Sequence, residues 1–310
     1  MITFPAVFQI FQPSTLKKIS ELIRIEHEIM AAIGGITGIL LAAKIGSGSF
    51  DIVTWADILF GMIVPALITS GAFGLNDYYD MEIDRINKRF DRPLVRGELN
   101  PEAVLWGSYG VIILGCLLCL HFGPLVFILT TVFGILSILY SYNLKDTGLI
   151  GNLIVTFSYA APWGIGAVVI LEKYPETRTA TNEITIVALV GMALSMGLGR
   201  EILKGIMDME GDNERNIRTV ALTRGPRFAA VCSVTLIFIG IGISIIPFFH
   251  GFKNNPFYLV TIMIPDVLLA YASIPLLFSQ EYSIAKRGRV FSLIAFVFGT
   301  VAILVGTLTQ

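Results

Sequence analysis

The chain alternates between long apolar runs and short polar stretches from residue 25 to its end. Because a helix needs about 20 consecutive apolar residues to cross the hydrocarbon core of a bilayer, each long run is predicted to be a membrane-spanning helix. Nine such windows occur, at 25–43, 56–76, 103–121, 124–142, 150–171, 184–204, 227–249, 257–278 and 290–308. Residues 14–24, just ahead of the first window, repeat apolar residues at helical spacing, which predicts a short helix at the membrane surface. The pattern therefore predicts an all-α membrane protein.

The composition agrees with this pattern. Of the 310 residues, 55% are hydrophobic and 15% are charged, and the mean hydropathy is +0.76, whereas soluble domains are nearer a quarter charged. We find no linker or low-complexity tract, so residues 1–310 are predicted to form one polytopic membrane domain. The near-zero net charge and the lack of a basic tract give no reason to expect a nucleic-acid partner. Residues 1–10 have no basic region ahead of their apolar residues, so no cleavable signal peptide is expected.

Lysine and arginine residues fall mainly on one side of the predicted bundle. Nine spans place the two termini on opposite sides, and 18 of the 22 basic residues lie on the side that bears the N-terminus. They are Lys17, Lys18, Arg24, Arg85, Lys88, Arg89, Arg92, Arg96, Lys145, Arg200, Lys204, Arg215, Arg218, Arg224, Arg227, Lys286, Arg287 and Arg289. Because cytoplasmic loops carry an excess of such residues, we expect a multi-pass protein of the cell membrane with a cytoplasmic N-terminus and an extracytoplasmic C-terminus.

Two acidic clusters recur on this side, where the second and the sixth spans end. The first cluster is Asn76, Asp77, Asp80 and Asp84, and the second is Asp208 and Asp212. The pattern Asp-Met-Glu-x-Asp occurs in both, at 80–84 and at 208–212, four spans apart. Aspartates spaced by three or four residues lie on the same face of a helix, where their charges repel. The repeat indicates two related halves of the chain, each of which supplies one cluster.

The type and place of these residues indicate a metal site. Acidic residues at the edge of a bilayer are costly and usually mark a functional site. Mg²⁺ relieves the repulsion, since it binds one or two carboxylates and completes its shell with water and phosphate oxygens of a substrate. Basic residues at the same edge suit a polyanion carried by the metal. We therefore predict a site for Mg²⁺ and a diphosphate, with the six residues of the two clusters as metal ligands. The alternative is that these residues are ordinary acidic residues that cap helices at the membrane surface.

The motif Asn-Asp-x-x-Asp-x-x-x-Asp at 76–84, followed by the second Asp-x-x-x-Asp at 208–212, resembles the UbiA superfamily of intramembrane prenyltransferases. The stretch from Tyr140 to Lys145 and the pair Gly151-Asn152 are also similar to that family, and the resemblance covers nearly the whole chain. It implies nine transmembrane helices around a central cavity, with an active site that opens to the cytoplasm under a cap. The cap would be formed by loops at about 80–102 and 205–226.

Within the superfamily, residues 199–212 and the start of the first span, Arg24-Ile-Glu26-His27, are most similar to the archaeal digeranylgeranylglyceryl phosphate synthases. This resemblance implies Mg²⁺-dependent transfer of a geranylgeranyl group from geranylgeranyl diphosphate to geranylgeranylglyceryl phosphate, which forms the second ether bond of archaeal membrane lipids. The partners would be a prenyl diphosphate donor, a lipid-like phosphate acceptor and the surrounding membrane lipids. One alternative is an aromatic acceptor, as in quinone, haem or chlorophyll pathways. An alternative from another class is a cation-coupled transporter.

The resemblance also implies roles for individual residues. The expected catalytic residues are Asp80, Asp84, Asp208, Asp212, Tyr140 and Lys145. The expected substrate-binding residues are Asn76, Arg85, Lys88, Arg92, Asn152, Arg200, Lys204, Arg24 and His27. The ring of Tyr140 would stabilise an allylic cation, and the basic residues would neutralise phosphate oxygens.

Two further polar groups lie within the predicted spans. His27 and the flanking Glu26 and Glu28 begin the first span. They either bind the acceptor and accept its proton, or they are ordinary interfacial residues near a helix start. Asp266 lies well inside the eighth span, where a carboxylate is a functional candidate. It can also satisfy a backbone group freed by Pro265, so the sequence leaves both interpretations open.

Overall fold

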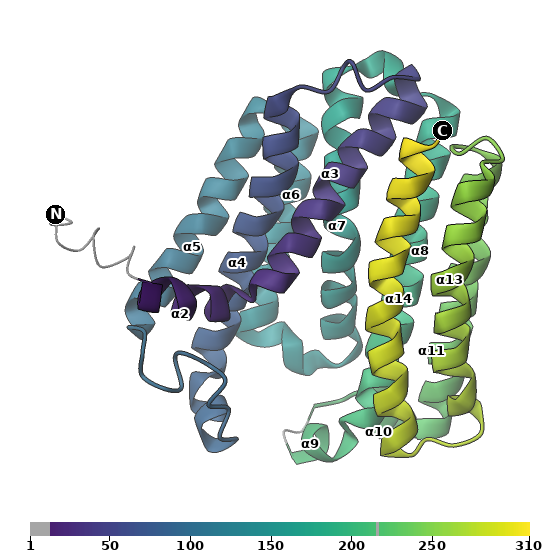
Figure 1. Cartoon of the computed structure of the whole chain (residues 1–310). Helices are drawn as coiled ribbons and strands as arrows, with labels where there is room; N and C mark the ends of the chain where they lie inside the picture. The colour runs from purple at the N-terminus through teal and green to yellow at the C-terminus, as the bar shows by residue number, and fades with distance from the viewer. Residues whose placement is uncertain (1–12, 215–216) are drawn as a thin grey trace, which may run out of the picture.

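The computed structural model describes residues 13–214 and 217–310, so the expectation for residues 1–10 lies outside the described residues. All the regular elements in these two ranges are helices (Figure 1). The long helices are α3 (Ile25–Ser47), α4 (Trp55–Ile86), α5 (Pro101–Leu118), α6 (Pro124–Leu139), α7 (Leu149–Lys173), α8 (Ala180–Met207), α11 (Pro226–Ser244), α13 (Pro256–Ser273) and α14 (Tyr282–Leu308). The short ones are α2 (Pro13–Ile23), α9 (Met209–Glu214), α10 (Val220–Arg224) and α12 (Ile246–Phe249).

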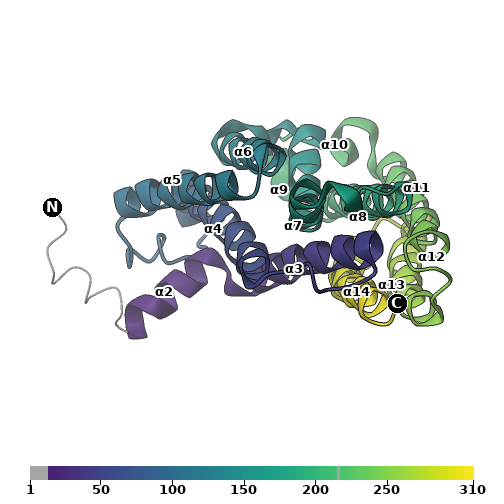
Figure 2. The ribbon, with the colours of Figure 1, turned by 90° about the horizontal axis from the view of Figure 1, so that it is seen from above.

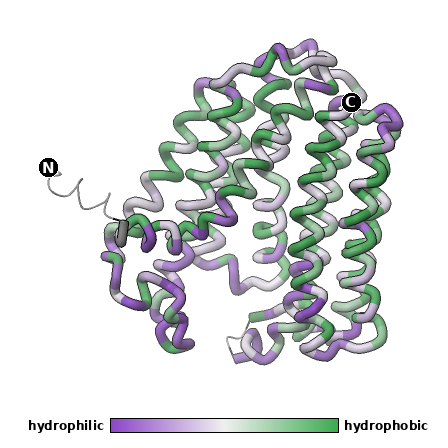
Figure 3. The backbone as a smooth tube through the Cα atoms, in the orientation of Figure 1, coloured by the Kyte–Doolittle hydropathy of each residue, from purple (hydrophilic) through white to green (hydrophobic). Residues whose placement is uncertain are grey.

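The nine predicted spans are confirmed in the described residues, each by a long helix or by a helix and the short turn that continues it. Each is long and apolar enough to cross a membrane. Figure 3 shows apolar residues along the middle of the helices and polar residues at the two ends of the bundle. The predicted surface helix at 14–24 is α2, which ends at Ile23. The chain is an all-α membrane protein.

The first predicted loop is shorter than expected. We placed its start at residue 80, whereas α4 continues to Ile86 and the loop begins at Asn87. The apolar run ends where charged residues begin. The helix can continue beyond that point, because its hydrogen bonds lie within its own backbone. The charged side chains of the last turns also pair within the helix, as Arg85 does with Glu82 at 3.0 Å. The first acidic cluster is therefore helical throughout.

The second predicted loop, at 205–226, is partly helical. Helix α8 ends at Met207, and the short helices α9 and α10 follow it. Thr219 begins α10 by accepting a hydrogen bond from the backbone N–H of Leu222, which is the usual role of a threonine at that position. In Figure 1, α9 and α10 lie at the same end of the bundle as α2. We call this end, at which α3 begins and α4 and α8 end, the charged end.

The long helices form a closed circuit. Helices that follow one another in the chain pack side by side from α3 to α8, then α8 packs on α11, α11 on α13 and α13 on α14. Helix α14 returns to pack against α3, and α3 also packs on α7 across the circuit, as the view from above shows (Figure 2). The arrangement brings the beginning of α3, the end of α4 and the end of α8 to one end of the bundle.

Three glycines allow α3, α4 and α7 to cross at very short distance. A Cβ atom on Gly35 of α3 would lie 2.2 Å from the carbonyl oxygen of Gly61 in α4. A Cβ atom on Gly166 of α7 would lie 2.3 Å from the carbonyl oxygen of Gly35. Small residues let membrane helices approach in this way, since packing rather than hydrophobic burial holds helices together in lipid.

Gly35→Ala is expected to lower the stability of the protein by about 1–3 kcal/mol, because the added methyl group must push α3 and α4 apart. The matched control is Gly110→Ala in α5, where an added Cβ meets nothing within 4 Å. That change is expected to be neutral or to stabilise by up to about 1 kcal/mol. Thermal unfolding of both variants in detergent tests the difference. Equal midpoints would show that the crossing is not tight in solution.

The other end of the bundle is fixed by two adjacent residues at the end of α7. The carboxylate of Glu172 accepts hydrogen bonds from the backbone N–H groups of Leu125 and Val126, each at 3.0 Å, and so caps α6. The ammonium group of Lys173 lies 2.8 Å from the buried carboxylate of Asp57 in the first turn of α4. One turn of α7 therefore sets the beginnings of α4 and α6.

Candidate functional site

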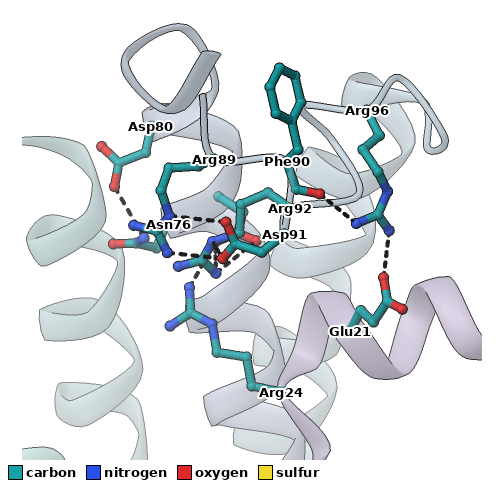
Figure 4. Close-up of polar contacts among 10 residues, drawn as sticks. Glu21, Arg24, Asn76, Asp80, Arg89, Phe90, Asp91, Arg92 and Arg96 are labelled. Carbon is teal, nitrogen blue, oxygen red and sulfur yellow. Dashed lines mark hydrogen bonds and ion pairs between the residues drawn. The ribbon is translucent and has the colours of Figure 1, made fainter. Parts of the chain in front are cut away.

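The last turns of α4 carry Asn76, Asp80 and Asp84 at intervals of four residues, so the three lie along one side of the helix. The side-chain amide of Asn76 donates a hydrogen bond to Oδ2 of Asp80 at 3.1 Å (Figure 4). The other carboxylate oxygen of Asp80 forms an ion pair with the ammonium group of Lys145. Lys145 begins η3 (Lys145–Thr147), a turn after α6. Asp84 is 7% exposed. This side of α4 thus faces the turn that follows α6.

Asp77 lies on a different side of α4. Its side chain is 1% exposed, and its Oδ1 atom accepts hydrogen bonds from Arg24 at 2.8 Å and from Arg92 at 2.9 Å. Figure 4 shows the guanidinium groups of Arg24 and Arg92 converging at this point. We predicted Asp77 as a metal ligand and the two arginines as substrate ligands. In this structure they bind one another, and the arrangement ties the start of α3 to the loop after α4.

Arg24 joins α2 to α3 in a strained backbone conformation. Its φ of 55° and ψ of 66° are left-handed, which costs a residue other than glycine about 1–3 kcal/mol. Its guanidinium group also lies 4.3 Å from the centre of the Phe73 ring. Burial lowers the pKa of Arg24, and the charge of Asp77 opposes that shift. The strain is held by these contacts, because they fix the side chain against α4.

The loop at 87–100 is held by further ion pairs. The guanidinium group of Arg89 donates two hydrogen bonds to the carboxylate of Asp91, each at 3.0 Å, and these lower the pKa of Asp91. Arg96 pairs with Glu21 in α2, as Figure 4 shows, and with Glu98 in the loop. Helix α2 is therefore attached to this loop and also packs on α4.

The second acidic cluster spans the break between α8 and α9. Asp208 ends α8 with φ −95° and ψ 10°, and Asp212 lies in the six-residue helix α9. The backbone N–H of Asp212 donates to the carbonyl oxygen of Asp208 at 2.9 Å, so the turn between them keeps helical pairing. Both side chains take part in interactions with other groups. The two residues remain one turn apart, as the sequence predicts.

The two clusters fit a magnesium ion in part. Carboxylate and carboxamide oxygens are the ligands that Mg²⁺ prefers. In residues 13–214 and 217–310, no three His, Cys, Asp or Glu side chains come within reach of one ion. An ion that takes one or two carboxylates from the protein and its remaining oxygens from water and a phosphate substrate would not require such a group. Each helix end supplies a set of that size.

A buried polar network lies on α8, beneath the second cluster. Oε1 of Glu201 accepts hydrogen bonds from the hydroxyl of Tyr159 at 2.8 Å and from Arg200 at 2.6 Å. Lys204, which is 41% exposed, lies 3.6 Å from the other carboxylate oxygen of Glu201. Arg200 is 6% exposed and also lies 5.9 Å from the centre of the Phe296 ring in α14. Arg200 therefore holds α7, α8 and α14 together, and Lys204 is the cation of this network that reaches outward.

Tyr140 and His27 lie within electrostatic reach of the polar residues of α8. Tyr140 begins η2 (Tyr140–Leu144), a wide helical turn after α6, and lies within electrostatic reach of Glu201 on α8 and Asp80 on α4. His27 lies within reach of Arg200, and its ring is 5.3 Å from that of Phe73. The structure thus gathers residues of α3, α4, α8 and the turn after α6 around one region of the charged end.

Three of the predicted substrate ligands show no side-chain contact with the residues of this region. Arg85 is exposed and pairs with Glu82. Lys88 is exposed at the start of the loop, with a left-handed φ of 54°. Asn152 lies in the first turn of α7, where its backbone carbonyl accepts a hydrogen bond from Thr156.

Sequence reasoning assigned no role to Glu201 and Tyr159, and it left Glu28 and Asp266 open. A signal for Glu201 was present, because a carboxylate beside an arginine within an apolar span is costly unless it is paired. Asp266 accepts a hydrogen bond from the hydroxyl of Ser244 at 2.7 Å, between α13 and α11. This contact lies away from the region around Tyr140 and favours the structural interpretation.

Comparison with known proteins gives the family. The model of the UbiA prenyltransferase family matches residues 31–297. The chain is 34% identical over 293 residues to the digeranylgeranylglyceryl phosphate synthase of Archaeoglobus fulgidus, covering 94% of this chain and 95% of that one. It is 31% identical over 300 residues to the enzyme of the same name from Saccharolobus solfataricus, covering 95% and 98%. The resemblance found in the motifs is confirmed.

Solved structures agree. A structure described as digeranylgeranylglyceryl phosphate synthase in membranes superposes with a TM-score of 0.78 and 28% identity, over 95% of this chain and 99% of that one. A UbiA homologue from Archaeoglobus fulgidus, solved with GPP and Mg²⁺, superposes with a TM-score of 0.57 and 15% identity, over 92% and 99%. The second likeness concerns the fold alone. With nine apolar helices in the part of the chain that the structure describes and a family match over most of its length, the chain belongs to the UbiA family of prenyltransferases.

Proposed function

We propose that this prenyltransferase moves a geranylgeranyl group from geranylgeranyl diphosphate to the free hydroxyl of geranylgeranylglyceryl phosphate, with Mg²⁺ as the metal. The observation that carries the reaction is the pair of acidic helix ends at one end of the bundle, with Lys145 against Asp80. The acceptor is proposed from the relatives, since several that bear the synthase name match over nearly the whole chain.

The donor would bind between the ends of α4 and α8. We assign Asn76, Asp80 and Asp84 to one metal position, and Asp208 and Asp212 to the other. Mg²⁺ bound there supplies Lewis-acid stabilisation of the departing diphosphate. Lys145 already lies against Asp80, so its ammonium group is placed to neutralise phosphate oxygens beside that carboxylate.

The region around Tyr140 would receive the allylic end of the donor. When diphosphate leaves, the prenyl group carries positive charge, and an aromatic ring stabilises a nearby cation by about 0.5–2 kcal/mol. Tyr140 lies within electrostatic reach of Asp80 in the first cluster and of Glu201 on α8. Water would capture this cation, and the apolar spans would exclude water from the interior of the bundle.

The acceptor phosphate requires a basic side chain that is not already held in a close ion pair with a carboxylate of the protein. Arg24 and Arg200 are engaged with Asp77 and Glu201. Lys204 is partly exposed and is held only loosely by Glu201. We therefore propose Lys204 as the principal ligand of the acceptor phosphate, with Arg200 and His27 as supporting contacts.

The charged end is proposed to face the cytoplasm, and the membrane is proposed to be the cell membrane. The support is the excess of lysine and arginine in the loops of that end. The surface helix α2, which is attached to the loop at 87–100 through Arg96 and Glu21, would then lie at the cytoplasmic surface.

A panel of donors and acceptors tests the function. Purified protein is offered radiolabelled prenyl diphosphates of 10, 15 and 20 carbons with geranylgeranylglyceryl phosphate, 4-hydroxybenzoate or a naphthoate. We expect product only from the glyceryl phosphate, with the 20-carbon donor preferred. Product from an aromatic acceptor would support the second candidate, which uses the same donor chemistry. The transporter hypothesis loses its basis, because the family is one of prenyltransferases.

Asp77→Asn is expected to lower the thermal midpoint by about 5 °C or more, because it removes the counter-ion of the partly buried Arg24 and the nearer of the two carboxylates paired with Arg92. Transfer should fall less than tenfold, and the Mg²⁺ concentration that gives half-maximal rate should stay unchanged. Thermal unfolding and a Mg²⁺ titration of the rate measure these effects. A large rise in the half-maximal Mg²⁺ concentration would instead support Asp77 as a metal ligand.

A further inference from the structure

One carboxyl group inside the membrane has no role in the reaction described so far. Glu28 lies one turn into α3 and is 4% exposed. Its Oε2 atom is 2.5 Å from the hydroxyl oxygen of Thr69 in α4, and its Oε1 atom is buried with no hydrogen-bond partner. Within the described residues no lysine, arginine or histidine forms an ion pair with it. A buried carboxyl without a cation is costly and is retained where it has a function.

The contrast with Glu201 shows what is unusual about Glu28. Glu201 is equally buried but is surrounded by Arg200, Lys204 and Tyr159, which hold it as an anion. The groups that act on the carboxyl of Glu28 are hydroxyls, those of Thr69 and its neighbour Ser70. Arg24, the residue just before α3, is engaged with Asp77 on α4. Glu28 is therefore free to exchange a proton without breaking an ion pair.

Thr69 can satisfy Glu28 in either protonation state. Its hydroxyl oxygen lies 2.5 Å from Glu28 and 2.7 Å from the backbone carbonyl oxygen of Pro65. A hydroxyl has one hydrogen to donate. When Glu28 is ionised, Thr69 donates to it. When Glu28 is protonated on Oε1, its Oε2 atom still accepts this hydrogen bond; a proton on Oε2 would instead be donated to Thr69, which then donates to Pro65. The pocket keeps one hydrogen bond to Oε2 in both states and leaves Oε1 for another group.

The position of Thr69 relates Glu28 to the metal site. Thr69 and Asn76 are seven residues apart on α4 and so share one face of the helix, separated by about 10 Å along its axis. Thr69 also lines a small cavity between α4, α6 and α7, together with Thr130 and Pro162, so this face looks into the interior. The reacting carbon is bonded to the diphosphate, so a diphosphate that points inward from Asn76 along this face would place that carbon between Asn76 and Thr69.

We propose that Glu28 binds the hydroxyl of the acceptor through Oε1 and takes up its proton as the ether bond forms; this rests on the proposed function. In that step the hydroxyl oxygen forms a bond to the first carbon of the prenyl group. The bond from that carbon to diphosphate breaks, and diphosphate leaves with the electron pair. The hydroxyl proton moves to Oε1 of Glu28. Of the residues that begin the first span, Glu28 is the proton acceptor, and His27 contacts the phosphate end.

The test compares Glu28→Gln with Glu26→Gln. Glutamine keeps the size and the hydrogen bond to Thr69 but cannot take a proton, and Glu26 is an exposed carboxylate two residues away. We expect Glu28→Gln to lower the transfer rate by about 100-fold, while binding of geranylgeranyl diphosphate with Mg²⁺ stays within twofold of wild type. Glu26→Gln should match wild type. Retention of more than a third of the wild-type rate in Glu28→Gln would overturn the proposal.

The pH dependence gives a second readout. The wild-type rate should rise with pH until Glu28 is ionised, Glu28→Asp should keep a rise of this kind at lower rate, and Glu28→Gln should lose it. The same rise in Glu28→Gln as in wild type would contradict the role. A wrong acceptor is distinguishable, because wild type would then give no product with geranylgeranylglyceryl phosphate. The variants are compared with wild type on whichever acceptor wild type uses.

Discussion

Replacing Asp80 with alanine is expected to reduce prenyl transfer by about a thousandfold or more. Asp80 is the residue of the α4 cluster that both Asn76 and Lys145 contact, so its loss removes a proposed metal ligand and the anchor of a proposed diphosphate ligand. Asp208→Ala, at the end of α8, is expected to have an effect of the same size. The measurement is transfer from radiolabelled geranylgeranyl diphosphate at saturating Mg²⁺.

Glu82→Ala is the matched control for Asp80→Ala. Glu82 lies two residues away on α4, and its exposed carboxylate pairs with the exposed Arg85. Its loss should leave the rate within twofold of wild type. Near-normal turnover in either Asp80→Ala or Asp208→Ala would contradict the assignment of two metal positions. Equal losses in Asp80→Ala and Glu82→Ala would show a general effect of negative charge at the helix end.

The spans and the two acidic clusters could be predicted because both are local properties of the sequence. A run of about 20 apolar residues is long enough to cross a bilayer regardless of how the other helices pack. Aspartates four residues apart share a helix face regardless of what packs against that face. The boundary of α4 was wrong for a related reason. Hydropathy indicates which part of a helix lies in lipid and not where the helix ends. Helix α4 continues through charged residues to Ile86.

The different partners of Asp77 and Asp80 within the first cluster could not be predicted. Helical spacing alone groups Asp77 with Asp80, since residues three apart differ by only about 60° around the axis. Which of these carboxylates is taken up in ion pairs depends on where Arg24 and Arg92 lie, and these are 53 and 15 residues away from Asp77 in the chain. The pairing of Glu28 with Thr69, across 41 residues, is set in the same way by the packing of α3 on α4.

Lys145→Met is expected to lower the rate of transfer by about 10²–10³-fold. Methionine keeps much of the length of the side chain and removes its charge. In the free enzyme the ammonium group neutralises Asp80, and in the proposed complex it also meets diphosphate oxygens, whose negative charge grows as the carbon–oxygen bond breaks. The contact therefore strengthens toward the transition state, so the loss should appear in kcat as well as in the KM for the donor. Steady-state kinetics with varied donor concentration measure both constants.

Lys173→Met provides the comparison, because Lys173 is also a lysine paired with a carboxylate of α4, Asp57, at the other end of the bundle. That variant should unfold at a lower temperature, since it leaves Asp57 buried without its cation, and should keep the wild-type kcat. Lys145→Met should show the reverse, with a small change in unfolding temperature and a large fall in kcat. If both variants lost stability and kept kcat, Lys145 would be a structural partner of Asp80, and the diphosphate would have to be neutralised by the metal and by other basic residues of the charged end.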